Sequence, residues 1–233
     1  MKDWLDHWHE FPAGMPEAAF FEQVGKTVNR KPVPEEFIGT IVSSIRYNLL
    51  LEPNDYVLDL CCGNGLLTKI VAEHCLFLTG IDYSDVLIHV ANKYNRPDNV
   101  TYVLGDVLNI RSLVSNEINK LYMYEAMQHF TSSMLSQLLD ELLFVANDKP
   151  LIFFVGSVPD RSKLWKFYNT LWRKLNYYWK SFNKEEAIGT WWEKGSIASI
   201  CKKKNLRVHF IDQNPMLHTA HYRFDMLITN CHD

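Results

Sequence analysis

The sequence predicts a single α/β domain, residues 1–233, built on a doubly wound, mostly parallel sheet. Two observations indicate this fold class. Short apolar runs alternate with segments whose apolar residues recur at helical spacing, which is typical of strands joined by crossover helices. The runs are also continuously apolar, as expected for strands buried on both faces. The chain is 47% hydrophobic and 22% charged, ordinary values for one globular domain of this length.

Seven strands and the helices between them follow from this alternation. The expected strands span 56–61, 76–82, 100–106, 120–125, 150–158, 207–212 and 221–229. The expected helices span 34–51, 65–74, 85–95, 131–146 and 193–204, so that helices cover both faces of the sheet. No helix separates the last two strands, which are therefore expected to form a C-terminal antiparallel hairpin.

An aromatic segment, residues 160–192, is too long for a simple crossover, and we interpret it as an inserted helical cap. Apolar residues recur at three- and four-residue steps from Leu164 to Phe182, which predicts one apolar helix face. This face either packs on the sheet domain or walls an acceptor pocket, with Trp191 and Trp192 near the mouth. A dimer face or a membrane-surface helix is a further interpretation, because basic amphipathic helices can bind lipid.

The first strand leads into a glycine turn within VLDLCCGNGLLT, residues 57–68. Gly63 and Gly65 allow a tight turn and a close approach of a ligand to the backbone. The dinucleotide fingerprint requires a third glycine where Thr68 stands, which disfavours a nicotinamide cofactor. The adjacent Cys61 and Cys62 have no second cysteine pair at metal-binding spacing, so no metal site is expected.

Residues 59–65, DLCCGNG, resemble the acid and glycine motif of class I S-adenosylmethionine-dependent methyltransferases, with Cys61 in place of the first glycine. The resemblance covers about residues 34–158. It implies a Rossmann-like fold that binds S-adenosylmethionine and releases S-adenosylhomocysteine. It also implies a set of cofactor-binding residues: Asp59, Cys61, Gly63, Asn64, Gly65, Asp82, Tyr83, Ser84, Asp106, Val107, Tyr124 and Glu125.

Three acids of this set end three successive strands, and the resemblance gives each a role. Asp82 is expected to accept from both ribose hydroxyls, since its two oxygens can pair with two vicinal donors. Asp106 is expected to accept from the adenine amino group, and Asp59 to face the ammonium group.

The N-terminal FFEQVGKT, residues 20–27, is similar to the opening of a narrower bacterial subgroup of small-molecule methyltransferases. GTWW at 189–192 and YRFD at 222–225 extend the resemblance. The GKT is not a phosphate loop, because Phe20 stands where the first glycine is required. We expect residues 1–33 to form a helical lid. Its Gln23, Lys26 and Thr27 would contact the methionine carboxylate or the substrate; the alternative is a solvated polar turn.

The loop after the fourth strand is expected to lie beside the transferred methyl group, as the resemblance implies. A hydroxyl acceptor benefits from a general base, and His129 suits that role because an unperturbed histidine titrates near pH ~6.5. The alternative is a histidine packed in the core. Arg223 has a guanidinium fork that suits an acidic substrate. The predicted substrate-binding residues are Gln128, His129, Trp191, Trp192, His221, Tyr222 and Arg223.

The predicted function is methyl transfer from S-adenosylmethionine to a small molecule, O-methylation above all, in natural-product or surface-glycan biosynthesis. The alternatives are a nicotinamide-dependent oxidoreductase and a non-catalytic cofactor-binding protein on the same fold. A net charge of -3 argues against nucleic acid as a partner. No apolar run has the ~18 residues of a membrane span, and five cysteines without an export signal favour the cytoplasm. Monomer and homodimer both remain open.

Overall fold

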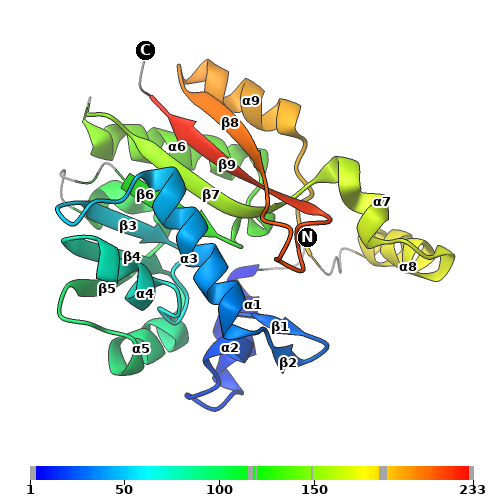
Figure 1. Cartoon of the computed structure of the whole chain (residues 1–233). Coiled ribbons are helices and arrows are strands. Elements are labelled where there is room, and N and C mark those ends of the chain that lie inside the picture. The colour runs from blue at the N-terminus through cyan, green and yellow to red at the C-terminus, as the bar shows by residue number, and fades with distance from the viewer. Residues whose placement is uncertain (1–3, 115–117, 119, 148, 184–187, 231–233) are drawn as a thin grey trace.

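The computed structural model describes residues 4–114, 118, 120–147, 149–183 and 188–230. Its centre is a seven-stranded sheet in the order β5-β4-β3-β6-β7-β9-β8 (Figure 1). All neighbouring strands are parallel except that β9 runs antiparallel to β7 and β8. The predicted fold class is thus confirmed, hairpin included. The strands are β3 (Tyr56–Leu60), β4 (Phe77–Asp82), β5 (Val100–Leu104), β6 (Lys120–Tyr124), β7 (Ile152–Pro159), β8 (Arg207–Asp212) and β9 (Arg223–Thr229).

Two helical layers enclose the sheet, each with its own buried cluster of apolar side chains. One layer contains α3 (Glu35–Leu49), α4 (Thr68–Val71) and α5 (Asp85–Tyr94); the other contains α6 (Ser132–Ala146), α9 (Lys194–Lys203) and the 3-10 helix η2 (Val107–Ser112). The expected helix 65–74 is shorter than predicted, because the chain is still in the glycine turn until Thr68 and tightens to 3-10 geometry at η1 (Ala72–His74).

The N-terminal segment lies against the edge of the sheet where the parallel strands end (Figure 1). It contains the helices α1 (Trp4–Ala13) and α2 (Phe20–Gln23) and the short strands β1 (Thr27–Val28) and β2 (Lys31–Pro32). From β3 the chain first adds β4 and β5 on one side and then β6 and β7 on the other, so the switch point lies between β3 and β6. Ligands of doubly wound folds bind at such a switch point. Residues 1–3 of the expected lid lie outside the described residues.

The aromatic insert departs from its prediction. It divides into η4 (Arg161–Lys163), α7 (Leu164–Phe167) and α8 (Leu171–Phe182), because Thr170 leaves helical geometry and its side chain caps α8 at the Arg173 N–H. Helix α8 stands beside the sheet rather than on it (Figure 1), and none of its residues is buried. The expected packing of this face on the domain is therefore wrong for α8. Residues 184–187 of the insert lie outside the described residues.

Candidate functional site

A cavity of about 800 Å³ follows the edge of the sheet at the carboxyl ends of the strands. One half is formed by the ends of β3, β4 and β5 and carries Asp59, Asp82 and Asp106. The other half lies around the end of β6 and the start of β9 and carries Glu125 and Arg223. Side chains of α1 and the backbone around Lys26 cover it. Its volume lies within the range of small-molecule sites.

The glycine turn after β3 needs left-handed backbone at three positions. Gly63 and Gly65 have φ values of 58° and 77°, and a Cβ at Gly65 would collide with the hydroxyl of Tyr102. Cys61 adopts a φ of 61° where the motif has its first glycine, at a cost of about 1 kcal/mol. Burial raises the pKa of Cys61 and of Cys62, so neither offers a thiolate at neutral pH.

Asp59 is a buried carboxylate at the end of β3. Its Oδ2 accepts from Thr68 Oγ1 at 2.6 Å and from the Tyr122 hydroxyl at 2.7 Å. No described residue donates to Oδ1, and Asp59 lines the cavity. Burial raises the pKa of Asp59 to about 7, against the lowering effect of those two hydrogen bonds. Part of Asp59 is therefore protonated near pH 7, and a cationic ligand group beside it would favour the ionised form.

Asp82 is the last residue of β4, Asp106 follows β5 by two residues, and both line the cavity. Asp82 Oδ2 accepts from the Gly63 N–H and Oδ1 from the Ser84 N–H, both at 2.9 Å, which fixes the orientation of the carboxylate across the glycine turn. Burial raises the pKa of Asp82. Asp106 is exposed, and its Oδ1 accepts from the Leu108 N–H at the start of η2. Neither forms an ion pair with a described residue.

Glu125, directly after β6, anchors the other half of the cavity. Its backbone is left-handed, with a φ of 57°, and its carboxylate pairs with the Lys26 ammonium and accepts from Ser157 Oγ. Burial alone would raise the pKa of Glu125, but the charges of Lys26 and Arg223 outweigh it and lower the value to about 2. Glu125 is therefore ionised at every physiological pH.

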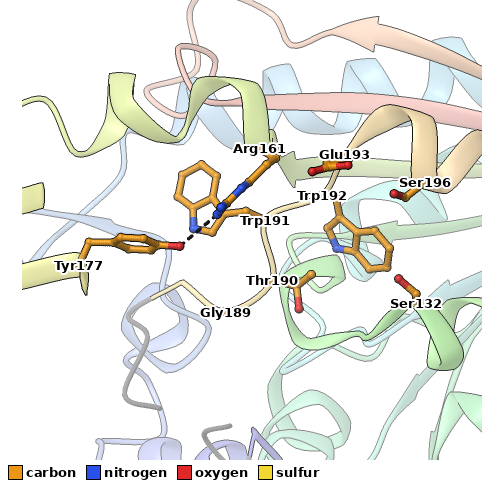
Figure 2. A pocket seen from close by; sticks show the side chains of 9 residues that line it. All are labelled: Ser132, Arg161, Tyr177, Gly189, Thr190, Trp191, Trp192, Glu193 and Ser196. Carbon is orange, nitrogen blue, oxygen red and sulfur yellow. Dashed lines mark hydrogen bonds between the residues drawn. The ribbon is translucent and has the colours of Figure 1, made fainter. Parts of the chain in front are cut away.

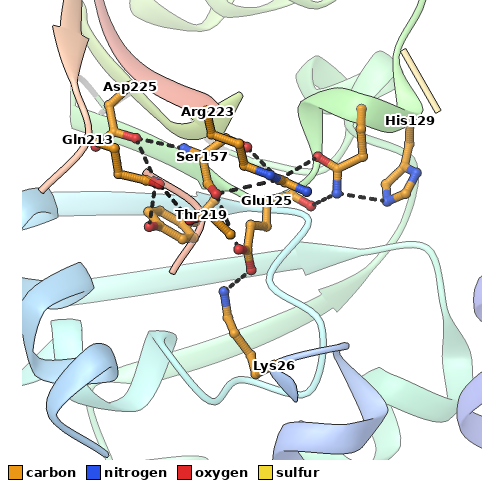
Figure 3. Close-up of polar contacts among 10 residues, drawn as sticks. Lys26, Glu125, His129, Ser157, Gln213, Thr219, Arg223 and Asp225 are labelled. Atoms are coloured by element: carbon orange, nitrogen blue, oxygen red, sulfur yellow. Dashed lines mark hydrogen bonds and ion pairs between the residues drawn. The ribbon is translucent and has the colours of Figure 1, made fainter. Parts of the chain in front are cut away.

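Arg223 is 7% exposed and presents an incompletely used guanidinium (Figure 3). Its Nη1 donates to the Ser157 carbonyl at 2.7 Å and lies 3.4 Å from Gln128 Oε1. No described residue accepts from Nε or Nη2, and Nε is enclosed. Since Arg223 lines the cavity and its Nη2 is not among the enclosed atoms, Nη2 is the donor that a ligand in the cavity could use.

His129 lies in the cavity wall beneath α1. Its ring packs on Trp4, with centroids 4.2 Å apart, and its Nε2 accepts from Trp8 Nε1 at 3.3 Å. An indole N–H only donates, so Nε2 carries a lone pair in this contact. The side chain predicted as a general base is thus placed in the cavity with its accepting nitrogen covered by the N-terminal helix.

The structure places most of the predicted cofactor set on the main cavity and three members outside its lining. Gln23 does not line the cavity: it is buried behind the glycine turn, where it donates to the Pro16 carbonyl and accepts from Asn64 Nδ2. Ser84 does not line it either, because its hydroxyl donates to the Trp8 carbonyl and caps α5. The other predicted members do line the cavity: Lys26, Thr27, Asp59, Cys61, Gly63, Asn64, Asp82, Tyr83, Asp106, Val107, Tyr124 and Glu125, with Gly65 supporting the turn beneath.

The structure brings four of the seven predicted substrate-binding residues to the main cavity and places three elsewhere. Trp191 and Trp192 line a second cavity of about 450 Å³ between α8 and α9 (Figure 2), not the one with the carboxylates. Trp192 is in the core and donates to the Met127 carbonyl at 2.8 Å. His221 is exposed and its Nδ1 lies 2.9 Å from the His218 carbonyl oxygen. Gln128, His129, Tyr222 and Arg223 line the main cavity, and no residue of 160–183 does.

Several site residues were missed from the sequence. Thr68 and Tyr122 hold Asp59, and the pattern gave only a negative interpretation of Thr68 as an absent glycine. Asp225 accepts from the Ser157 N–H and from Gln213 (Figure 3). It thereby holds the bulge of β7 at Ser157, whose carbonyl accepts from Arg223. These partners are far apart in the sequence, so no local signal identifies them. Among the described residues no group of His, Cys, Asp or Glu is arranged to hold a metal ion.

Residues 57–148 match the model of the family described as methyltransferase domain. Among curated proteins, the ubiquinone biosynthesis O-methyltransferase of Coxiella burnetii (strain Dugway 5J108-111) is 39% identical over 54 residues, 22% of this chain and 23% of that protein. The 23S rRNA (uracil(1939)-C(5))-methyltransferase RlmD of Legionella pneumophila (strain Paris) is 29% identical over 107 residues, 43% of this chain and 22% of that protein. The chain thus spans less than a quarter of the length of these relatives.

Solved structures resemble the whole chain. A SAM-dependent methyltransferase from Anabaena variabilis ATCC 29413 has a TM-score of 0.63 at 18% identity, over 97% of this chain and 93% of that one. Magnesium protoporphyrin IX methyltransferase from Synechocystis PCC 6803, with bound SAH, has a TM-score of 0.58 at 16% identity, over 97% of each chain. At such identities the likeness shows the fold alone, which is the Rossmann-like fold of these two methyltransferases. No helix among the described residues has the length and apolar character to cross a bilayer.

Proposed function

We propose that this protein transfers a methyl group from S-adenosylmethionine to a small-molecule acceptor. One observation carries the proposal: three carboxylates, Asp59, Asp82 and Asp106, stand within two residues of the ends of three adjacent strands and line one cavity, and none forms an ion pair with a described residue. This carboxylate wall, formed by Asp59, Asp82 and Asp106, suits a ligand that brings positive charge and hydroxyl donors, as S-adenosylmethionine does.

A nicotinamide dinucleotide fits this wall poorly. Its diphosphate needs backbone N–H groups at a helix N-terminus, together with positive charge. Here the helix after the turn, α4, has four residues and no side-chain cap, and the Gly63 N–H is already bonded to Asp82. Calorimetric titration with S-adenosylhomocysteine and with NADH tests the proposal: we expect saturable binding of the first alone. Binding of NADH alone would favour the oxidoreductase, and binding of neither would reject cofactor binding.

Binding should depend on pH through Asp59. The pKa of this carboxyl is raised from 3.8 to about 7, so the free protein holds a proton in this window that the unfolded chain has lost. The Asp59 contribution to stability is thus lost as pH rises towards 7. A bound ammonium group favours the ionised carboxylate, so binding at pH 6 should release up to one proton and strengthen as pH rises to about 7. Calorimetry in two buffers of different ionisation enthalpy measures this proton release. The Asp59→Asn variant should bind without releasing the proton. Binding by the wild type that does not depend on pH would contradict the prediction.

Transfer requires an acceptor atom aligned with the activated methyl group and shielded from water. When bound, the cofactor would supply a methyl group on a positively charged sulfonium, which leaves as a neutral thioether. The protein supplies the carboxylate wall that orients it, and the aromatic side chains of α1 that exclude water. We propose that α1 opens as a lid, and that an acceptor hydroxyl then replaces the Trp8 indole N–H at the Nε2 of His129, which takes the proton.

The base role of His129 can be tested in its own right. His129→Gln should lower kcat by about 10²- to 10⁴-fold, the usual contribution of general base catalysis, and remove the acidic limb of the pH–rate profile. Trp8→Phe is the matched control, because it keeps the ring cover and removes only the N–H donor to Nε2; its kcat should not fall by a comparable factor. A His129→Gln variant with wild-type kcat and pH profile would exclude the base role.

Arg223 predicts an acceptor that carries an acidic group. A buried guanidinium gains more from a carboxylate or phosphate than from a neutral carbonyl, because hydrogen bonds between charged groups are about twice as strong as neutral ones. With radiolabelled S-adenosylmethionine, we expect phenolic acids to be methylated in preference to the matching phenolic amides. Arg223→Gln should raise the KM for acids by roughly 10- to 100-fold and remove this preference. Equal use of acids and amides by the wild type would contradict the prediction.

A further inference from the structure

Helix α8 presents its apolar face to solvent. Six bulky apolar or aromatic side chains of this one helix are each more than half exposed: Leu171, Trp172, Leu175, Tyr178, Trp179 and Phe182. At 3.6 residues per turn they fall within an arc of roughly 120°. A continuous exposed apolar patch of this kind marks an interaction surface rather than ordinary surface composition.

The helix is attached to the rest of the protein by its opposite side. Tyr177 packs on Tyr168, with centroids 4.8 Å apart, and accepts from Arg161 Nη1 at 3.1 Å (Figure 2). The Arg173 guanidinium lies 4.8 Å from the centre of the Phe167 ring. Most surface helices pack their apolar face inward and leave the polar face outside. Helix α8 has the reverse arrangement, so its apolar face is held in place for something outside the chain.

The charge of the segment that carries this face favours an anionic partner. Residues 161–182 contain six basic side chains, Arg161, Lys163, Lys166, Arg173, Lys174 and Lys180, and no acidic one, in a chain of net charge -3. A second copy would bring the same cations against these, which disfavours a dimer through this face. Lysine and arginine flanking tryptophan and tyrosine suit the interface of an anionic bilayer, where the rings lie at headgroup level.

We propose that α8 binds in the plane of a membrane surface that contains anionic lipid. Its 12 residues extend about 18 Å, too short for a hydrocarbon core of about 30 Å, so the helix lies on the bilayer and does not span it. Phe167 packs on Tyr222 with ring centroids 4.6 Å apart, and Tyr222 lines the main cavity. The membrane-bound helix is therefore connected, through the rings of Phe167 and Tyr222, with the acceptor half of the cavity, which is the half that carries Glu125 and Arg223.

Co-sedimentation with vesicles tests the proposal and requires neither cofactor nor acceptor. The full chain is mixed with vesicles of phosphatidylcholine, or of phosphatidylcholine and phosphatidylglycerol. We expect the wild type to sediment with the anionic vesicles only. Trp172→Ser combined with Trp179→Ser should abolish this. Lys166→Glu combined with Lys180→Glu should weaken partitioning by at least about fivefold per cation removed. Tyr47→Ser combined with Leu50→Ser, two exposed apolar positions near the end of α3, is the matched control and should bind as wild type.

Two results would overturn the proposal. One is failure of the wild type to bind anionic vesicles. The other is equal binding by the wild type and the tryptophan variant. Sedimentation velocity without lipid tests whether a second copy of the chain covers α8 instead. If the wild type is a dimer, the tryptophan variant is a monomer and neither binds vesicles, α8 is a self-association face. All these substitutions are at surface positions, and circular dichroism confirms that each variant is folded before it is compared.

Discussion

Asp82→Ala should weaken binding of S-adenosylhomocysteine by roughly 10²- to 10⁴-fold. The expected contacts to the two ribose hydroxyls are hydrogen bonds to a charged acceptor, which contribute about 1.5–3 kcal/mol each. The substitution also removes the acceptor for the Gly63 and Ser84 N–H groups, so the glycine turn loses the link that fixes it to β4. Isothermal titration calorimetry with S-adenosylhomocysteine measures the loss directly.

The matched control is Asp85→Asn, three residues further along at the start of α5. Its side chain is 68% exposed and contacts His9 rather than the cavity, so affinity for S-adenosylhomocysteine should stay within about twofold of the wild type. Asp106→Asn should have an intermediate effect, because this carboxylate is solvated and keeps its cap on η2. Unchanged affinity in a folded Asp82→Ala variant would mean that the ribose is held elsewhere, and the assignment of the carboxylate wall would be wrong.

The carboxylate wall was predictable because it depends on two local regularities and one rule of topology. Strands β3, β4 and β5 are mostly apolar runs, and an acid stands next to last in β3, last in β4 and two residues after β5. Parallel strands bring their carboxyl ends to one edge, so the three acids meet. The strand expected to reach Asp106 ends earlier, at Leu104, because Asp106 turns out of the sheet to cap η2.

The acceptor half was only partly predictable, because its geometry depends on contacts between distant segments. Glu125 is held by an ion pair with Lys26, 99 residues earlier in the chain, and Arg223 donates to the carbonyl of Ser157 at the bulge in β7. The aromatic pattern over 160–182 correctly indicated helical periodicity and an apolar face. It could not show that Thr170 interrupts the helix or which way α8 faces, because an apolar stripe has the same sequence whether it meets a core or a partner. Trp191 and Trp192 are similarly ambiguous: both border the second cavity, but Trp192 is also part of the buried core.

Glu125→Ala should destabilise the fold more than any other substitution in the cavity. It leaves the ammonium of Lys26 and the guanidinium of Arg223, each less than 9% exposed, without the carboxylate between them. Removing one partner of a buried ion pair typically costs about 3–5 kcal/mol. Urea unfolding followed by tryptophan fluorescence should therefore show a clearly lower midpoint. Because the pKa of Glu125 is lowered to about 2, its contribution to stability is complete above about pH 4.5 and is lost as pH falls towards 2.

Lys26→Met and the double variant distinguish a charge effect from a packing effect. Lys26→Met leaves Glu125 beside Arg223, still an opposite charge, so its cost should be smaller than that of Glu125→Ala. The double variant removes both members of the pair and should recover about 1–3 kcal/mol relative to the sum of the single variants, since no ammonium is then buried alone. Strictly additive losses would contradict this, because they would show that the two side chains act independently and that the Lys26–Glu125 contact does not hold the lid segment to the end of β6. A non-additive recovery would place the closure of the cavity on one ion pair that joins the N-terminal segment to the sheet.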